Sequence, residues 1–366
     1  MSVDVRPGPL TRPTGVADRA RRGRTLRGRT GARFSVRLEG RTALVCAGLL
    51  AALAAVVAVL LTTGDYPLTV PQAVSALLGQ GRPADAFVVT GLRLPRVVVG
   101  VLVGVALGVA GAVFQQVTRN PLGSPDVIGF THGAVTGALV VLLVLGGTGS
   151  AVPLGALVGG SANAALVYAL SVRGGLQGYR LILVGIGVSA VLIAVNNYLL
   201  TRSRVEQAQA AQLWITGSLN ARGWDQALPL AVGLAVLLPV LLVLGRSLTL
   251  LDLGDDAARA LGVRVDRLKL AVLAAAVAVT ALAATAAGPI AFIALAAPQV
   301  ARRLTGAVGS GLVAAGLTGA VLLLLSDLAA QRLFSPVQLP VGVMTGAVGG
   351  LYLCWLLVAQ WRRGLG

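Results

Sequence analysis

The sequence predicts an all-α protein that crosses a lipid bilayer several times. Of its 366 residues, 56% are apolar and only 12% are charged, whereas soluble domains carry about 25% charged residues. Ten apolar segments of about 20 residues, the length that spans the hydrocarbon core of a bilayer, would account for this composition. The predicted spans are 43–63, 93–115, 127–146, 150–172, 181–201, 226–245, 269–287, 289–304, 311–331 and 340–361.

Residues 1–42 differ in composition from the rest of the chain. They are rich in Arg, Gly and Pro and lack a helical apolar period, so we expect a disordered cytosolic tail. A nucleic-acid-binding arm is the alternative, but no folded module for nucleic acid follows and we expect no such partner. Arg21 and Arg22 resemble a twin-arginine export signal, yet the next apolar run is too long for one. Residues 43–366 are therefore predicted to be the transmembrane domain.

The distribution of basic residues predicts the orientation of the spans. An even number of spans places both termini on one side of the membrane. Most of the 30 Lys and Arg residues fall in the tail and in the loops on that same side, which the positive-inside rule assigns to the cytosol. Both termini are thus predicted to be cytosolic.

Several chemistries are excluded because their residues are almost absent. The only histidine is His132, the only lysine is Lys269, and the two cysteines are Cys46 and Cys354. Histidine or thiolate metal sites therefore have too few ligands, and we expect no metal. Because Lys269 precedes a leucine, no GxxxxGK[ST] phosphate loop exists. If ATP drives this protein, a separate partner subunit must bind and hydrolyse it, and we expect no directly bound cofactor.

Two arginines open the second predicted span on its outer side. Arg93 and Arg96 flank Pro95, which suits the first turn of a helix. Positive charge at a helix N-terminus is mildly unfavourable, so an acidic group should offset it. Lipid phosphate or snorkelling to the interface is one explanation, and a partner protein that presents carboxylates is the other. Spacing alone favours the first explanation.

A cytosolic loop at about 246–268 carries the pattern of a short capped helix. Asp255 and Asp256 favour a helix N-terminus, Arg259 lies three and four residues further on, and Gly262 suits the C-terminal stop. Such a helix on the membrane surface is either a rigid handle for a soluble subunit or an ordinary interfacial loop. Periodicity does not decide between the two.

Polar residues within the spans are the candidates for a transport pathway. They are Ser189, Asn196 and Asn197 in the fifth span and Thr285 in the seventh. Asp327, near the outer end of the ninth span, is the only acid within a predicted span. An ion-coupled secondary transporter normally buries ionisable residues along its route, so their scarcity disfavours that class. The break at Gly288–Pro289 predicts a helix end there, and transporters often place such interruptions near their pathway.

The chain from about 43 to 361 resembles the FecCD/BtuC family of ABC-importer permeases, the type II importers for iron–siderophores, haem and cobalamin. The resemblance is carried by RLPR (93–96), VALGVAGAVFQQVTRNPLGSPDVIGFTHGA (105–134), LILVGIGVSA (181–190), LGDDAARALGV (253–263), GPIAFIALAAPQVARRL (288–304), SDLAAQRLF (326–334) and LPVGVMTGAVGG (339–350). It implies a BtuC-like permease fold of ten helices in the bacterial cytoplasmic membrane. It also implies a second permease subunit, an ABC ATPase dimer and an extracytoplasmic siderophore-binding protein.

The resemblance also implies roles for particular residues. Arg93 and Arg96 would meet carboxylates of the binding protein. The family's third docking arginine falls on Gln331 here, and Arg332 follows it, so Arg332 is the expected substitute. The loop would be the coupling helix that docks on the ATPase, with the residues Gly254, Asp255, Asp256, Ala257, Ala258, Arg259, Leu261 and Gly262.

Two further segments narrow the resemblance to one subgroup. WITGSLNARGW (214–224) and APQVARRL (297–304) are similar to the FepG-type half of catecholate-siderophore importers such as the ferric-enterobactin system, which implies a heterodimer with a FepD-like permease. The implied function is passage of a ferric siderophore through a subunit that is not an enzyme. A cobalamin or haem permease of the same family is the alternative.

Overall fold

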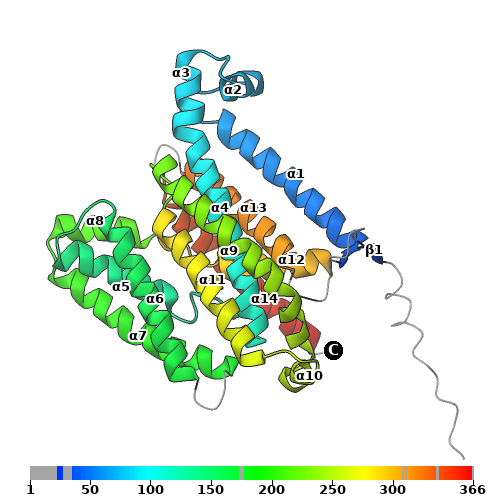
Figure 1. Ribbon diagram of the computed structural model, residues 1–366. Coiled ribbons are helices and arrows are strands. Elements are labelled where there is room, and N and C mark those ends of the chain that lie inside the picture. Colours follow the sequence, from blue (N-terminus) through cyan, green and yellow to red (C-terminus); the bar gives the residue numbers. More distant parts are fainter. Residues whose placement is uncertain are drawn as a thin grey trace, which may run out of the picture.

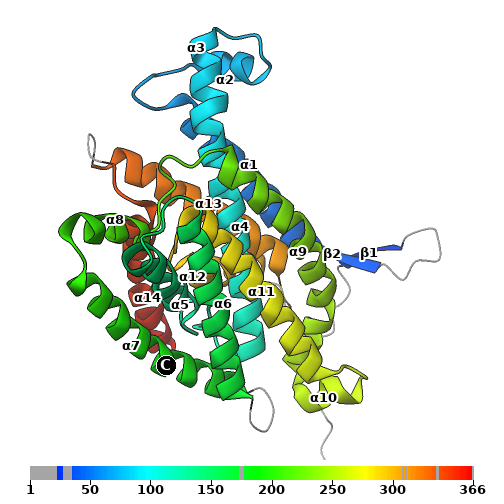
Figure 2. The ribbon, with the colours of Figure 1, turned by 60° about the vertical axis from the view of Figure 1, so that its left-hand side comes forward.

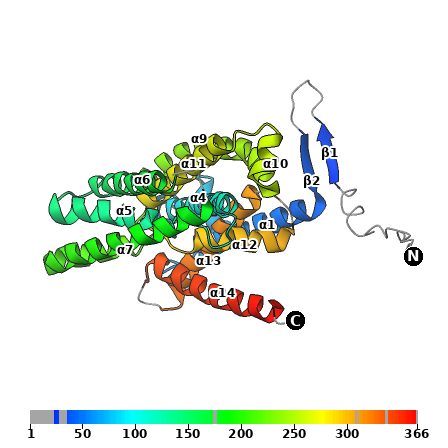
Figure 3. The same ribbon diagram turned by 90° about the horizontal axis from the view of Figure 1, so that it is seen from below.

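The computed structural model describes residues 23–27, 35–172, 177–306, 309, 311–334 and 338–364. Most of the described chain forms one bundle of helices (Figure 1). The strands β1 (Gly23–Arg27) and β2 (Ser35–Glu39) form an antiparallel pair that lies beside the bundle in Figure 3. This pair falls within the tail that we expected to lack regular structure. The remainder of residues 1–34 lies outside the described residues.

The long helices follow the predicted apolar segments closely. Each predicted span overlaps one helix or one continuous helical stretch. In chain order, the helical elements are α1 (Gly40–Thr62), α2 (Val70–Leu77), α3 (Pro83–Ala86), the π-helical turn η2 (Phe87–Arg93), α4 (Leu94–Thr118), α5 (Phe130–Leu139), the π-helical turn η3 (Val140–Val144), α6 (Ala151–Ser171), α7 (Gly178–Arg202), α8 (Val205–Ile215), α9 (Trp224–Leu250), the 3-10 turn η4 (Leu251–Leu253), α10 (Asp255–Ala260), α11 (Val265–Ala287), α12 (Ile293–Thr305), α13 (Leu312–Arg332) and α14 (Val341–Gly364).

Within the described residues, seven of these helical stretches are long and apolar enough to cross a membrane. The helical stretches 130–144 and 341–355 are apolar but shorter. The prediction of an all-helical membrane domain with several apolar spans is therefore confirmed. The number ten stays a prediction.

Helix α4 forms the centre of the bundle (Figure 2). In the apolar window of its span 78% of the residues are buried inside the chain, compared with 17% for α7 and 11% for α1. The packing that buries α4 depends on small residues: Gly104 and Gly108 lie against the backbone of α13 at Ala320 and Ala315. Lipid tails are as apolar as side chains, so close backbone contact of this kind stabilises helix association in a membrane.

The predicted break at Gly288–Pro289 is present. Helix α11 ends at Ala287, and Gly288 adopts a left-handed φ of 76°, a conformation that glycine tolerates best. The chain resumes as α12 at Ile293. The helix on the C-terminal side of the break is thus only 13 residues long, whereas a helix that spans the hydrocarbon core usually has about 20.

Three helical segments were not predicted. Helices α2 and α8 have 8 and 11 residues, and α3 with η2 extends the second span at its N-terminal end. A search for apolar runs of bilayer length does not detect elements this short. Helix α9 also continues to Leu250, five residues beyond the predicted end of that span.

Candidate functional site

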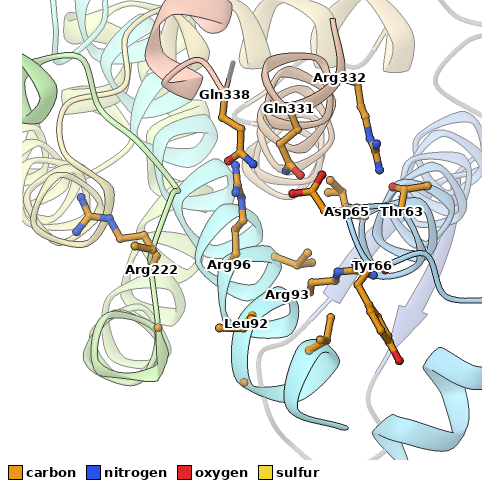
Figure 4. Close-up of a pocket in the computed structure, with 17 residues that line it drawn as sticks. Thr63, Asp65, Tyr66, Leu92, Arg93, Arg96, Arg222, Gln331, Arg332 and Gln338 are labelled. Carbon is orange, nitrogen blue, oxygen red and sulfur yellow. Dashed lines mark hydrogen bonds between the residues drawn. The ribbon is translucent and has the colours of Figure 1, made fainter. Parts of the chain in front are cut away.

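A large cavity lies at the end of the bundle where α1 ends and α4 begins. Its volume is about 790 Å³, and Figure 4 shows the side chains that line it. Four arginines contribute to its wall, whereas Asp65 is the only carboxylate among its lining residues. The structure brings together the three predicted docking arginines, Arg93, Arg96 and Arg332, from helical stretches that are far apart in the sequence. We call this cavity the outer pocket.

Arg93 fastens α1 to the start of α4. Its Nη1 donates to the carbonyl of Leu61 at 2.7 Å, and its Nη2 donates to the carbonyl of Tyr66 at 2.5 Å. These carbonyls belong to the last turn of α1 and to the loop that follows it, where helix geometry leaves acceptors without intrahelical partners. Arg93 thus has a structural role that its sequence position did not reveal.

Arg96 is paired inside the chain. Its Nε and Nη2 donate to Oδ2 and Oδ1 of Asp327 at 3.0 and 2.8 Å. The amide of Gln331 donates to the same carboxylate at 2.8 Å. Asp327, the only acid within a predicted span, is therefore the acidic group that offsets the charge of Arg96.

Arg332 and Arg222 complete the basic lining of the outer pocket. Arg332 is exposed, and in Figure 4 its guanidinium points into the cavity. Arg222 donates through Nε to the carbonyl of Ser218 at 3.1 Å, and burial lowers the pKa of its guanidinium. Its charged end points away from the other arginines (Figure 4). Of the three predicted docking residues, Arg332 offers the most accessible charge.

The predicted short helix in the loop is present as α10, at the opposite end of the bundle from α2 and α3 (Figure 1). Its flanking glycines, Gly254 and Gly262, have left-handed φ values of 106° and 85°, which explains why glycine suits both positions. Arg259 and Asp256 form the expected ion pair three residues apart, at 3.0 Å. Ala258 faces the bundle and is fully buried.

The other predicted loop carboxylate, Asp255, has two cationic partners from the transmembrane helices. Its Oδ1 lies 2.6 Å from Nη2 of Arg119, and its Oδ2 lies 2.6 Å from Nζ of Lys269. Burial would raise the pKa of Asp255, but the hydrogen bond and charge of Lys269, with the charges of Arg119 and Arg259, lower it below its ordinary value. The sequence analysis missed this cluster. Lys269 as the only lysine, at the edge of an apolar run, was the available signal.

The four predicted pathway residues do not form one site. Asn196 is buried and accepts a hydrogen bond from Thr136 at 2.7 Å. Ser189 is buried and Thr285 half-buried, and each donates to a carbonyl of its own helix, Gly185 and Leu282 respectively. Only Asn197 is exposed on the surface of the chain.

The described residues contain no group of three or more His, Cys, Asp and Glu side chains that could hold a metal ion. The polar groups that do cluster are cations at the outer pocket and ion pairs around α10. These groups can hold or dock anionic protein surfaces, and none is a nucleophile with a base beside it. A bundle of membrane-spanning helices with a cluster of charged side chains at each of its two ends places the chain in the class of multi-pass membrane proteins.

The chain belongs to the FecCD transport family, whose profile matches residues 50–359. It is 46% identical over 303 residues to the ferric enterobactin transport system permease protein FepG of Escherichia coli K12, covering 83% of this chain and 92% of the relative. It is 37% identical to the achromobactin transport system permease protein CbrC of Dickeya dadantii, covering 91% and 95%. A solved inward-facing structure described as a metal-chelate type ABC transporter matches with a TM-score of 0.76 and 28% identity, over 87% of this chain and 99% of the other.

These findings confirm the resemblance that the motifs indicated. The protein is a permease subunit of an ABC importer, not an enzyme, and a separate subunit supplies the ATPase activity. They also confirm its place as a multi-pass protein of the bacterial cytoplasmic membrane.

Proposed function

We propose that this permease subunit carries a ferric siderophore across the cytoplasmic membrane, and that its cargo is a catecholate of the enterobactin type. The relative that imports ferric enterobactin is 46% identical, compared with 37% for the achromobactin permease. Permeases of this family serve more than one siderophore, so the cargo class rests on the higher identity and on the FepG-type segments at 214–224 and 297–304.

The observation that carries the proposed mechanism is the exposed surface of α10 and its flanks. Leu253, Asp256 and Leu261 have exposed fractions of 64%, 101% and 62%, although two of these residues are apolar. The chain has no phosphate-binding loop of its own, so the conformational change driven by ATP hydrolysis must reach it through a contact with another subunit. We propose that this surface, with Arg259, docks on the ABC ATPase.

The outer pocket is the proposed docking site for the extracytoplasmic binding protein. Arg332 supplies an exposed positive charge, and Arg93 and Arg96 supply the basic wall behind it. Carboxylates on the binding protein would complement this charge and speed its association. The orientation follows, with α2 and the outer pocket outside the cell and α10 in the cytosol.

We further propose ten membrane-crossing helices with both termini in the cytosol. The seven long spans are joined by the shorter stretch 130–144, by α12 and by α14. The start of α1 is tied to the end of α12, since Nε of Arg41 donates to the carbonyl of Leu304 at 2.9 Å. Near the end of the same α12, Arg303 lies over the ring of Trp355 in α14, 4.9 Å from its centroid. Residues 1–42 would then extend into the cytosol.

The exposed sides of α7 and α14 are the proposed contacts with a FepD-like second permease. Apolar side chains such as Ile186, Val191, Val348 and Leu351 are exposed on these helices. Asn197 lies on α7 too, and an amide that faces lipid is unfavourable. We therefore place Asn197 on the pathway between the two permeases and regard Ser189, Asn196 and Thr285 as less accessible candidates.

Reconstitution in liposomes tests this function. The permease, a FepD-like partner, the ATPase and the binding protein should together accumulate ferric enterobactin when ATP is inside. Omission of the ATPase should abolish accumulation. Uphill transport by the permease chain alone would overturn the proposal, and accumulation of only haem or cobalamin would overturn the cargo assignment.

A further inference from the structure

We propose that Asp255 is a positioning residue that fastens α10 to α4 and α11, so that movement of the coupling helix displaces the buried centre of the bundle. This inference rests on the proposed docking of α10 to an ATPase. The two adjacent aspartates of the loop then have different roles: Asp256 contacts the partner, and Asp255 holds the helix to the membrane domain.

The first support is the geometry of the ion pairs around Asp255. Each carboxylate oxygen lies 2.6 Å from a different cation, Arg119 at the end of α4 and Lys269 in the first turns of α11. The exposed fraction is only 27% for the Asp255 side chain and 6% for that of Lys269. Charge-assisted hydrogen bonds shielded from water are stronger than exposed ones, so the pair with Lys269 is the stronger of the two, since the Arg119 side chain is 47% exposed. One residue of α10 is thus bound to two different spans.

A second set of contacts ties the other side of the same loop to α4. Arg119 also donates through Nη2 to the carbonyl of Leu251 at 2.8 Å, and the amide of Gln116 donates to Asp252 at 3.0 Å. The last turn of α4 therefore holds both η4 and α10, on either side of Gly254. The φ of 106° at Gly254 marks a bend at this junction. Without these bonds, α10 would connect to the spans only through the loop backbone and the packing of the buried Ala258.

Asp256, in the same helix turn as Asp255, differs from it in both exposure and pairing. Its side chain is 101% exposed and pairs only with Arg259, whose side chain is 49% exposed. An exposed ion pair three residues apart in a helix contributes little to stability. Asp256 is therefore free to meet another protein, whereas Asp255 is already engaged within the chain.

The position of α4 explains what this attachment does. Helix α4 is the most buried span, packed against α13, α11, α12 and α9. Close-packed elements move as units instead of deforming continuously. The Arg119–Asp255–Lys269 cluster would transmit a displacement of α10 to α4 and α11. Because α4 contacts most of the other helices, the displacement would then reach most of the bundle. Removal of the cluster should leave the ATPase bound but lower the amount of siderophore transported per ATP hydrolysed.

The complete importer in liposomes is the system for the test, with Asp255→Asn as the variant. Asp266→Asn is the matched control: it neutralises another loop carboxylate, which is 64% exposed and lies 3.8 Å from Arg259. We expect Asp255→Asn to keep the ATPase in the purified complex while the siderophore transported per ATP falls by at least about fivefold, the lower end of measured coupling between sites. The control should stay within about twofold of the parent.

A second pair of variants separates positioning from folding. Lys269→Met, which leaves the pair with Arg119 in place, should lose part of the coupling, and the double variant Asp255→Asn/Lys269→Met should lose no more than Asp255→Asn, because contacting residues are not additive. Asp255→Glu should restore most of the coupling, since it keeps the charge. If Asp255→Asn does not fold, Arg119→Gln, which leaves the pair with Lys269 in place, should still lower the coupling below that of Asp266→Asn.

Two outcomes would overturn the inference: coupling in Asp255→Asn equal to that in Asp266→Asn, or loss of the ATPase from the Asp255→Asn complex. The second outcome would make Asp255 part of the contact surface. Failure of the proposed function has a different signature. If Leu261→Asp leaves both ATPase binding and transport unchanged, α10 is not the docking element, whatever Asp255 does.

Discussion

Arg96 and Asp327 join the N-terminal end of α4 to the C-terminal part of α13 through two parallel hydrogen bonds of 3.0 and 2.8 Å. The two residues are 231 positions apart in the sequence, and the exposed fraction of the Asp327 side chain is 1%. This pair fixes one edge of the outer pocket. It also means that two of the five N–H donors of the Arg96 guanidinium are used inside the chain.

Replacement of Asp327 by Asn should destabilise the protein. The variant leaves the largely buried Arg96 charge without its carboxylate, and loss of one partner of such a pair costs about 3 kcal/mol. We expect a lower midpoint of thermal unfolding in detergent. Asp65→Asn, in the same pocket but in the loop after α1, should shift that midpoint much less. Equal midpoints for the two variants would contradict the assigned role of the pair.

Gly108 is the second position where the fold should be sensitive to one substitution. A Cβ atom there would overlap the backbone carbonyl of Ala315 in α13, and backbone cannot rotate out of the way. Gly108→Ala should therefore lower the free energy of unfolding by about 3 kcal/mol, the usual cost of overpacking a core. Gly48→Ala in α1, where no atom lies within 4 Å, is the control and should not lower stability, because alanine favours a helix interior more than glycine does. Folded yield and unfolding midpoint in micelles measure both.

Much of the bundle could be predicted because a bilayer imposes a length on each apolar segment. The predicted break at Gly288–Pro289 and the short helix at 255–260 were also readable, since each depends on residues that are close in sequence. Helices α2 and α8 were missed because they are shorter than a bilayer is thick. The strands β1 and β2 were missed because their segments are rich in arginine and glycine.

The pairing of charges could not be predicted in the same way. Arg119 and Asp255 are 136 positions apart, and which cation meets which carboxylate depends on how α4, α11 and α13 pack. Depth in the membrane gave a partial signal, because the sequence placed both Arg96 and Asp327 near the outer surface. The burial of Asn196 beside the exposed Asn197 likewise depends on the rotation of α7, which periodicity did not define.

The titration of Asp255 should report its attachment to the spans. Lys269 and Arg119 hold its pKa below the ordinary value of 3.8. A carboxylate whose pKa is lowered by folding stabilises the folded loop at pH values above its ordinary pKa. This stabilisation is lost as the pH falls through the lowered pKa of the folded state. In ¹³C spectra of labelled aspartates, the Asp255 signal, identified by its loss in Asp255→Asn, should titrate below those of exposed aspartates. Lys269→Met should raise that pKa, and an unchanged titration would contradict the pairing.

Arg332 should matter for docking of the binding protein more than Arg93 does. Its charge is exposed in the outer pocket, whereas the Arg93 guanidinium is bound to the carbonyls of Leu61 and Tyr66. Arg332→Glu should slow association with the binding protein about tenfold at low salt, because charge at the rim of an interface acts mainly on the association rate. High salt should reduce the difference between variant and parent. Surface plasmon resonance on the nanodisc-embedded importer measures both rates, and a salt-independent effect would contradict an electrostatic role.

Asn196 and Asn197 are adjacent in sequence but should respond oppositely to substitution by leucine. Asn196 is buried and accepts the hydroxyl hydrogen bond of Thr136, so Asn196→Leu should lower the free energy of unfolding by about 1 kcal/mol, typical of hydrogen bonds between membrane helices. The loss stays modest because the single hydroxyl proton of Thr136 can then be donated to the carbonyl of His132, which lies at 2.8 Å. Asn197→Leu removes an exposed amide and should leave stability within about 0.5 kcal/mol of the parent. Its expected defect is in siderophore transport by the reconstituted importer at normal ATPase binding. If Asn197→Leu transports normally while Asn196→Leu does not, the pathway lies on another face of α7.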